Sequence, residues 1–522
     1  ARPAAMARGA WNLLLFPVLV VTPLLCMVRW RLQAWDWAGA GRLSGAPVRM
    51  PRRDGGAALE SWVREGLKVY LYDAAALRPV AREVFGEAAW WSAYEAWSRE
   101  PSTFPWANST SGDAESPGAF IFSELRRALE ARAPAVEIVD SPDSADLVLW
   151  NVWDVALCQA SGHQALAWEL QKGRLSQSCP AHFALLAWLQ RTPRWRRNHG
   201  RDHVLYVDSP YSWESYLDYT PEWKLQQTHA LPPFVPDQQE VRGITRNATM
   251  IGIEERRLPE HRGSSSFVAV PYFASTDKYQ APLSRGRSHL VGFAASSVLN
   301  NYSACEVCSQ MPYGPTEIRA RIFEDLRSGC TAGECEVYDL TEAIGADQRN
   351  NLTFYASAGV DLGEVVHDAT FCPIPRGDSG CTKRLFAAIL GGCIPVILSD
   401  SLVLPFASAV DYRGAMLRVP EAQLMSPGFS LLALLRSQTP RQTAALRAGL
   451  ARVRGAISYR PGAGPAVGTP GRRVQGRAAL PRADPDAMDF LVASLARRAR
   501  RPREDLAITA AGLYGSEPVM VT

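Results

Sequence analysis

The sequence has no large excess of charge of either sign. It carries 56 basic and 52 acidic side chains, a formal net charge of +4 at neutral pH. Proteins that mainly bind nucleic acid present a concentrated basic surface, so nucleic acid is not an expected partner. Cysteine is also scarce: ten residues are too few for a scaffold built on disulfides, although they suffice for several bridges in an oxidising compartment.

Signs of global disorder are missing as well. The 522 residues are 47% hydrophobic and 21% charged, fractions that are ordinary for a folded protein. Because the chain is too long for one compact core, we expect about two to three domains. Glycine and proline are slightly enriched, and the enrichment is local: it falls in the segments 29–65 and 454–482.

The longest uncharged run lies near the N-terminus. Residues 9–28 are long enough to cross a hydrocarbon core of about 30 Å. A cleaved signal peptide would need an Ala-x-Ala pattern directly after the run, but Arg-Trp-Arg follows at 29–31 and the first such pattern is at 38–40. A buried soluble helix would be broken by Pro17 and Pro23. We therefore expect a transmembrane signal-anchor.

Glycosylation sequons set the expected orientation of this anchor. The flanking arginines are nearly balanced, two on each side, so the positive-inside rule does not decide. Four Asn-x-Ser/Thr triplets lie after the apolar run and favour a lumenal body, hence a type II topology. These triplets begin at Asn108, Asn247, Asn301 and Asn351.

Apolar segments with polar ends alternate with segments of helical period. This pattern predicts an α/β fold with parallel sheets, in two Rossmann-like lobes that face each other across a cleft. The expected strands are 67–72, 146–151, 201–208, 288–293, 336–340, 369–374 and 394–399, and the expected helices are 119–131, 182–191, 317–326, 383–390 and 486–495. The expected division is a cytosolic tail (1–10), a transmembrane segment (11–28), a stem (29–65), two lobes (66–285 and 286–453), a low-complexity loop (454–482) and a C-terminal helix and tail (483–522).

The densest chemical signal is FCPIPRGDSGCTKRLFAAILGGCIPVILSD at 371–400. A strand ends in a Pro-Arg-Gly-Asp turn, a loop with hydroxyl groups follows, and a helix begins near Lys383. A helix N-terminus with free N–H groups, hydroxyls and arginines is suited to an anion, which predicts a diphosphate site. The alternative is an ordinary strand–loop–helix unit whose arginines are solvated.

This segment resembles the exostosin-type glycosyltransferases. The shared residues are Pro375, Gly377, Asp378, Thr382, Arg384, Leu385, Phe386, Ala388, Gly392–Val396, Ser399 and Asp400, followed by Leu404–Phe406. Further matches at 69–73, 144–148 and 193–203 extend the resemblance over about residues 66–500.

The resemblance implies a type II Golgi membrane enzyme with a GT-B fold. Such an enzyme moves a hexosyl or pentosyl unit from a nucleotide sugar, usually UDP-linked, to a glycan or glycoprotein acceptor. It implies inversion and independence of a metal or other cofactor. It places the acceptor on the N-terminal lobe and the nucleotide sugar on the C-terminal lobe. An oligomer with itself or with related transferases is a further expectation.

The resemblance also assigns roles to named residues. Arg376 and Arg384 neutralise the diphosphate, Ser379 and Thr382 donate hydrogen bonds to it, and Gly377 belongs to the same turn. Arg319 and Arg287 are weaker candidates for the first task. The triplet Asp484-Pro485-Asp486 is interpreted as a helix cap, not a metal site.

Two positions depart from the family pattern. The acidic residue expected to hold the ribose is replaced by Ala387. This keeps open a second hypothesis, a catalytically weak glycan-binding or partner subunit of a glycosyltransferase complex. The usual His-Asp ending of the third strand is replaced at 207–210, so Asp208 is the candidate general base, with a turn-forming role as the alternative. His203 is expected to be structural.

The cysteines allow two interpretations. Cys305, Cys308, Cys330 and Cys335 have a spacing that could bind zinc. In an oxidising lumen, disulfides are the favoured fate of these residues. A third class of function, a secreted lectin, would require cleavage after the apolar run.

Overall fold

The computed structural model describes parts of the chain between residues 66 and 500. The described residues are 66–86, 88–99, 125–126, 128–130, 136–152, 156–157, 160–161, 180–206, 248–253, 267–272, 274, 276–297, 312–341, 360–377, 380, 382–459 and 485–500. The expected cytosolic tail, transmembrane segment, stem and most of the low-complexity loop therefore lie outside them. Among the described helices, none has the length and apolar character needed to cross a membrane.

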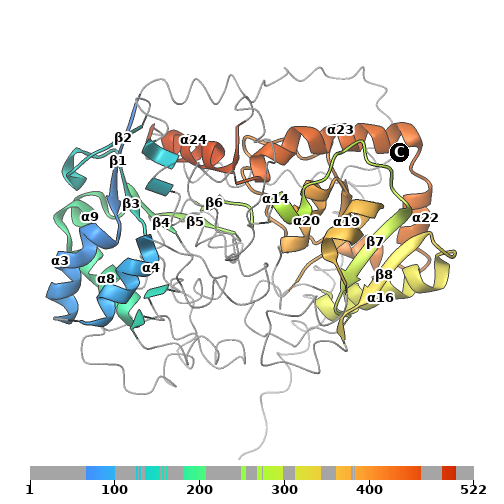
Figure 1. The fold of residues 1–522 in the computed structure, drawn as a ribbon, viewed down its shortest axis with the longest axis horizontal. Helices are drawn as coiled ribbons and strands as arrows, with labels where there is room; N and C mark the ends of the chain where they lie inside the picture. The colour runs from blue at the N-terminus through green and yellow to red at the C-terminus, as the bar shows by residue number, and fades with distance from the viewer. Residues whose placement is uncertain are drawn as a thin grey trace, which may run out of the picture. The chain divides into compact units, whose positions relative to one another are not determined.

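The N-terminal half forms a six-stranded parallel sheet in the order β2-β1-β3-β4-β5-β6 (Figure 1). The strands are β1 (Leu67–Tyr72), β2 (Val136–Ile138), β3 (Leu147–Trp150), β4 (His203–Tyr206), β5 (Thr249–Gly252) and β6 (Phe267–Ala269). The predicted strands at 67–72, 146–151 and 201–208 are confirmed as β1, β3 and β4. Strands β2, β5 and β6 were not expected from the sequence.

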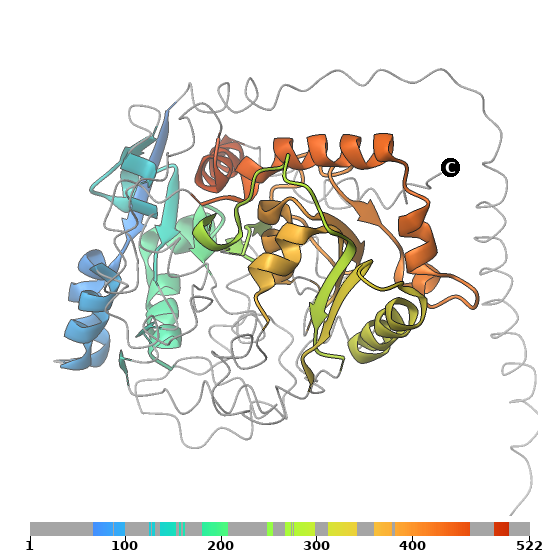
Figure 2. The same ribbon diagram turned by 45° about the vertical axis from the view of Figure 1, so that its right-hand side comes forward.

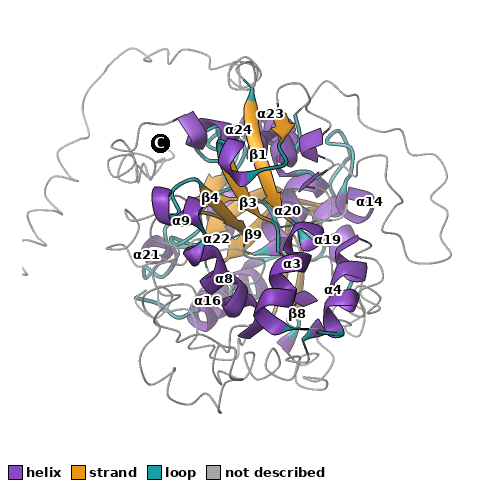
Figure 3. Cartoon of the chain, turned by 90° about the vertical axis from the view of Figure 1, so that its left-hand side faces the viewer, coloured by secondary structure: helices purple, strands orange, loops and turns teal. Residues whose placement is uncertain are grey.

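Helices pack on this sheet through apolar faces (Figure 3). They are α3 (Ala74–Phe85), α4 (Trp90–Arg99), α8 (Pro180–Arg191) and α9 (Pro193–Asn198). The 3₁₀ turn η2 (Pro142–Ser144) has no buried residue. Helix α14 (Thr276–Tyr279) packs instead against helices of the C-terminal half. The start of α3 is fixed by Asp73, whose carboxylate accepts a hydrogen bond from the Ala76 amide at 3.0 Å. The predicted helix at 182–191 corresponds to α8.

The C-terminal half forms a five-stranded parallel sheet in the order β11-β10-β9-β7-β8. Its strands are β7 (His289–Ala295), β8 (Cys335–Asp339), β9 (Ala369–Pro375), β10 (Ile394–Leu398) and β11 (Leu417–Arg418). The four longest of these strands were predicted. Together the two parallel sheets confirm the α/β class and are consistent with a GT-B-like pair of lobes.

Helices cover both faces of the second sheet. Figure 2 shows α19 (Leu362–Asp368) and α20 (Lys383–Gly391) on one side of β7, and α16 (Pro315–Gly329) on the other. Helices α21 (Glu421–Leu424), α22 (Leu431–Arg436) and α23 (Pro440–Ile457) follow the last strand. Helix α23 continues beyond residue 453, where the expected lobe ends. The predicted helices at 317–326 and 383–390 are confirmed as α16 and α20.

The last helix, α24 (Ala487–Arg500), contacts both halves of the chain. Arg498 on this helix donates a hydrogen bond from Nε to the Thr249 hydroxyl on β5, at 2.9 Å. Phe490 stacks on Phe406 from the C-terminal half, with ring centroids 5.7 Å apart. The predicted helix at 486–495 is therefore confirmed, and its apolar face is part of the shared core.

Candidate functional site

The predicted diphosphate segment lies at the carboxyl end of β9. Strand β9 ends at Pro375, and α20 begins at Lys383. Carboxyl ends of parallel strands are the usual ligand edge of such sheets. Asp378, Ser379 and Cys381 lie outside the described residues, so the position expected for Ser379 stays a prediction.

Thr382 is the N-cap residue of α20, as the predicted helix start requires. Its backbone is extended, and its side chain makes no capping hydrogen bond. An uncapped helix N-terminus leaves backbone N–H groups available to an anion. Thr382 therefore lies where its hydroxyl and the first turn of α20 could face the same ligand.

Arg384 lies one residue further, in the first turn of α20. Its side chain is partly buried. Nη1 is shielded from solvent and has no hydrogen-bond partner among the described residues. A shielded guanidinium nitrogen without a partner is costly, and an oxyanion would satisfy it. Of the predicted residues, Arg384 is the one whose environment most favours an anionic ligand.

Arg376 is completely buried and forms part of the protein's own framework. Its Nε lies 3.4 Å from Oε1 of Glu421, and its Nη2 donates to the Tyr313 carbonyl. The exposed fractions of the two paired side chains are 0% and 1%. Arg376 therefore shapes the turn that leads to Gly377, and its charge is balanced by a carboxylate of the same chain.

Arg319 stabilises this turn by hydrogen bonds to its backbone. It is buried on α16 and donates to the Arg376 carbonyl from Nε and Nη2, at 3.3 and 3.2 Å. A third bond runs from Nη1 to the Ser296 carbonyl at 3.1 Å. Arg319 thus fixes the backbone at the carboxyl ends of β7 and β9.

Glu421 was missed by the sequence analysis. Burial raises the pKa of Glu421, and the charge of Arg376 opposes that shift. Its Oε1 accepts from the Asp400 amide at 3.2 Å, and its own amide donates to Asp400 Oδ2 at 3.2 Å. Glu421 follows a proline at the start of a short helix, so in the sequence it resembles a helix-start residue. No local signal distinguishes it from one.

Ser399 and Asp400 of the shared motif have a structural role in the site. Ser399 Oγ donates to the Gly380 carbonyl at 2.9 Å and so anchors the loop before α20. Asp400 exchanges backbone and side-chain hydrogen bonds with Glu421. The end of β10 therefore holds both the loop and the partner of Arg376.

Arg287 lies at the other end of α20. It donates to the carbonyls of Val366, His367 and Gly391, which terminate α19 and α20. A cation suits helix C-termini because the helix dipole is negative there. The nine residues of α20 separate this end from Thr382 by about 13 Å. The contacts of Arg287 are thus those of a residue that holds helix ends together.

Two further positions bear on the predictions. Ala387 is fully buried within α20. Its methyl side chain cannot replace the carboxylate that the family pattern has at this position. Asp208, the candidate base, lies outside the described residues. His203 pairs with Asp202 at the start of β4, with Nδ1 and Oδ1 2.9 Å apart, as expected for a structural residue.

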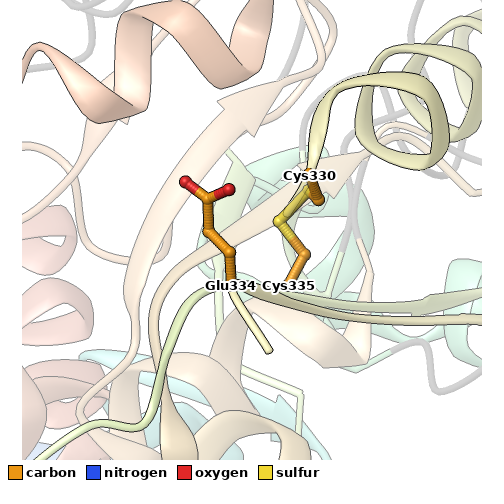
Figure 4. Close-up of side chains that lie close together, drawn as sticks. All are labelled: Cys330, Glu334 and Cys335. Carbon is orange, nitrogen blue, oxygen red and sulfur yellow. A yellow bond between two sulfur atoms is a disulfide. The ribbon is translucent and has the colours of Figure 1, made fainter. Parts of the chain in front are cut away.

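Two disulfides form among the described cysteines. Cys372 on β9 bonds to Cys393, directly before β10, and Cys330 bonds to Cys335. Figure 4 shows the second bond beside Glu334. A disulfide sulfur is not the thiolate that zinc binds, so this bond contradicts the four-cysteine zinc alternative. Cys305 and Cys308 lie outside the described residues.

Comparison with known proteins identifies the family. Residues 64–434 match the exostosin GT47 domain, which covers well over half of the chain. A probable arabinosyltransferase, ARAD1, of Arabidopsis thaliana is 25% identical over 327 residues, 62% of this chain. A probable xyloglucan galactosyltransferase, GT20, of the same plant is 23% identical over 290 residues, 54% of this chain. Exostosin-2 of Bos taurus is 35% identical over 94 residues, 18% of this chain.

The chain therefore belongs to the exostosin GT47 family. Its matched part spans 60% of the arabinosyltransferase, 44% of the galactosyltransferase and 12% of exostosin-2. The family segment includes both parallel sheets and the turn between β9 and α20.

Proposed function

We propose that this protein is a glycosyltransferase that moves a hexosyl or pentosyl unit from a UDP-linked sugar to a glycan or glycoprotein. The names of the relatives support transfer of a pentose or a hexose. The single observation that carries the proposal is Arg384 at the uncapped start of α20, whose Nη1 has no hydrogen-bond partner among the described residues. Inversion at the transferred carbon and independence of a metal are parts of this proposal.

The donor site in this proposal is narrower than the sequence suggested. Arg384, Thr382 and Ser379 bind the diphosphate, together with the backbone near Gly377. Arg376 and Arg319 position this turn from within the protein, and Arg287 is not part of the site. Fixed donors aimed at a departing diphosphate stabilise the charge that develops in the transition state. An arginine fork matches two phosphate oxygens at once.

An inverting transfer also needs a base for the acceptor hydroxyl. We keep Asp208 as the candidate for this role, because a carboxylate near the end of a strand can accept that proton. The N-terminal lobe would bind the acceptor. The uncharged run at 9–28 would hold the protein in the Golgi membrane with a lumenal body, alone or as an oligomer with related transferases.

Binding of UDP to the purified lumenal body tests the donor site. Arg384→Ala removes a charge-assisted hydrogen bond, so UDP affinity should fall roughly tenfold or more. Arg441→Ala, at an exposed position on α23, is the matched control and should leave the affinity unchanged. No measurable UDP affinity, or no loss with Arg384→Ala, contradicts the proposal. Turnover with a panel of UDP-sugars then identifies the donor.

A second candidate function is a catalytically weak partner subunit. The fully buried Ala387 favours it, because the carboxylate expected to bind the ribose is missing from that position. UDP binding without turnover of any UDP-sugar would support this candidate.

A further inference from the structure

The structure contains a concave site away from the proposed donor turn. A cavity of about 470 Å³ lies where α22 ends, α23 begins and strands β7 and β9 start. We call it the α22–α23 groove; its walls include Thr370, Leu435, Gln438, Thr443, Ala444 and Arg447. This volume lies within the range of typical small-molecule sites, about 300 to 1,000 Å³.

The groove and the donor turn lie at opposite ends of the same strand. Thr370 is the second residue of β9, whereas Arg376 follows its last residue. Six residues of extended chain span about 20 Å. A ligand in the groove is therefore not the diphosphate of the donor.

One cation in the groove, Arg447, has no counter-ion among the described residues. Arg447 forms no salt bridge or hydrogen bond with the described residues, and its Nε is shielded from solvent. Arg436, which also lines the groove, differs, because its Nη2 lies 2.6 Å from a carboxylate oxygen of Glu334. Among the described residues, a carboxylate thus balances the charge of Arg436 but not that of Arg447.

Arg447 belongs to a set of arginines whose charges repel one another. Burial and the charges of Arg447, Arg285 and Arg454 together lower the pKa of Arg287 to about 10. The charge of Asp368 opposes this lowering, but Asp368 already pairs with Arg285 at 2.7 Å. An added anion would reduce this repulsion as well as satisfy Arg447.

The remaining wall residues suit a ligand whose uncharged part is partly apolar and partly hydroxylated. Leu435 and Ala444 offer apolar surface, and Thr370, Thr443 and Gln438 offer hydroxyl and amide groups. We propose that the α22–α23 groove binds a small organic oxyanion through Arg447. The anionic group is a carboxylate or a phosphate ester, and the rest of the ligand is partly apolar and partly hydroxylated. This site is independent of the proposed transferase activity.

Calorimetric titration of the folded lumenal body tests this site. The probes are glucuronate, glucose 6-phosphate, neutral glucose and inorganic phosphate, each with and without saturating UDP. At least one of the two sugar anions should bind at least tenfold more tightly than either glucose or inorganic phosphate. The affinity should be the same in the presence of UDP, because the donor turn is at the other end of β9.

Two variants and one control separate charge from shape. Arg447→Gln removes the charge and should weaken the better sugar anion at least tenfold. Ala444→Trp keeps the charge but fills the groove from an exposed helix position, and should also abolish binding. Arg441→Gln, on the same helix but not on the groove wall, should change nothing.

Several results overturn the proposal. They are equal affinity for glucose, equal affinity for inorganic phosphate, displacement by UDP, and equal effects of Arg447→Gln and Arg441→Gln. If Arg447→Gln fails to fold, Ala444→Trp alone decides. Loss of UDP binding in the Arg384→Ala variant would bear on the donor site only, so the two proposals fail separately.

Discussion

Glu421 and Arg376 form an ion pair that solvent does not reach. Nε and Oε1 are 3.4 Å apart, with exposed fractions of 0% for Arg376 and 1% for Glu421. The pair joins the carboxyl end of β9 to the start of α21. Because Asp400 also hydrogen-bonds to Glu421, three segments that surround the proposed donor turn depend on one carboxylate.

Removal of Glu421 should therefore be costly. Glu421→Ala leaves the Arg376 guanidinium buried without its counter-ion, which should lower the free energy of unfolding by about 3 kcal/mol. Urea denaturation followed by circular dichroism measures this loss. Glu324→Ala, at a side chain that is 71% exposed, is the control and should stay within about 0.5 kcal/mol of the parent.

A paired replacement distinguishes charge from packing. Arg376→Met combined with Glu421→Leu removes both buried charges and should recover much of the stability lost in Glu421→Ala. UDP affinity should still fall in the double variant if the pair positions the turn before α20. A cost for Glu421→Ala no greater than that for Glu324→Ala contradicts this account.

Asp202 predicts how stability depends on acid. Burial alone would raise the pKa of Asp202, but the hydrogen bond and charge of His203 lower it. Asn198 and Arg194 add to this lowering, and the result is a pKa of about 2, against an ordinary value of 3.8. Because the folded-state pKa is the lower one, its stabilisation is present above pH 4 and is lost as the pH falls toward 2.

This contribution can be measured by unfolding in urea between pH 2 and pH 6. The pKa shift corresponds to a loss of about 2 kcal/mol in the free energy of unfolding as the pH falls from 6 to 2. Asp202→Asn should be less stable at pH 6 and should show a flatter pH profile below pH 4. Asp140→Asn, at an exposed site, serves as the control. Parallel profiles for the parent and Asp202→Asn would rule out this role.

The two disulfides should differ in their effect on stability. Cys372 and Cys393 are separated by 21 positions in the sequence, whereas Cys330 and Cys335 are separated by 5. In the chain-entropy account, the longer loop restricts the unfolded chain more, so the Cys372→Ala/Cys393→Ala variant should lose about 3 kcal/mol. The Cys330→Ala/Cys335→Ala variant should lose about 2 kcal/mol. Thermal unfolding compares them, and the reverse order contradicts the prediction.

Sequence patterns were sufficient for the longer strands. Most of them are apolar runs with polar ends, and each has its own local signal. Strands β5 and β6 are short, with four and three residues, and have no strong period. They are strands because β4 and β5 offer them hydrogen-bonding edges, which is tertiary information.

The site was predicted less completely than the fold. The motif predicted that Arg376 would face the diphosphate. The sequence does not show that its side chain is buried and paired with Glu421. Glu421 lies on α21, far from Arg376 in the sequence, and no local sequence pattern predicts that the two residues pair. The position of Arg384 in the first turn of α20 was predictable, because helix starts have local signals.

Arg287 provides a test of where the donor site ends. Its three hydrogen bonds to helix-terminal carbonyls should make Arg287→Ala less stable by about 2 kcal/mol. UDP affinity, measured at a temperature where the variant is folded, should stay within about twofold of the parent. Arg285→Ala, at a side chain that is 45% exposed, controls for the local loss of charge. A tenfold loss of UDP affinity in folded Arg287→Ala, but not in Arg285→Ala, would instead bring Arg287 into the donor site. The opposite end of α20 would then have to reach the diphosphate, which the present arrangement of Thr382 and Gly391 does not allow.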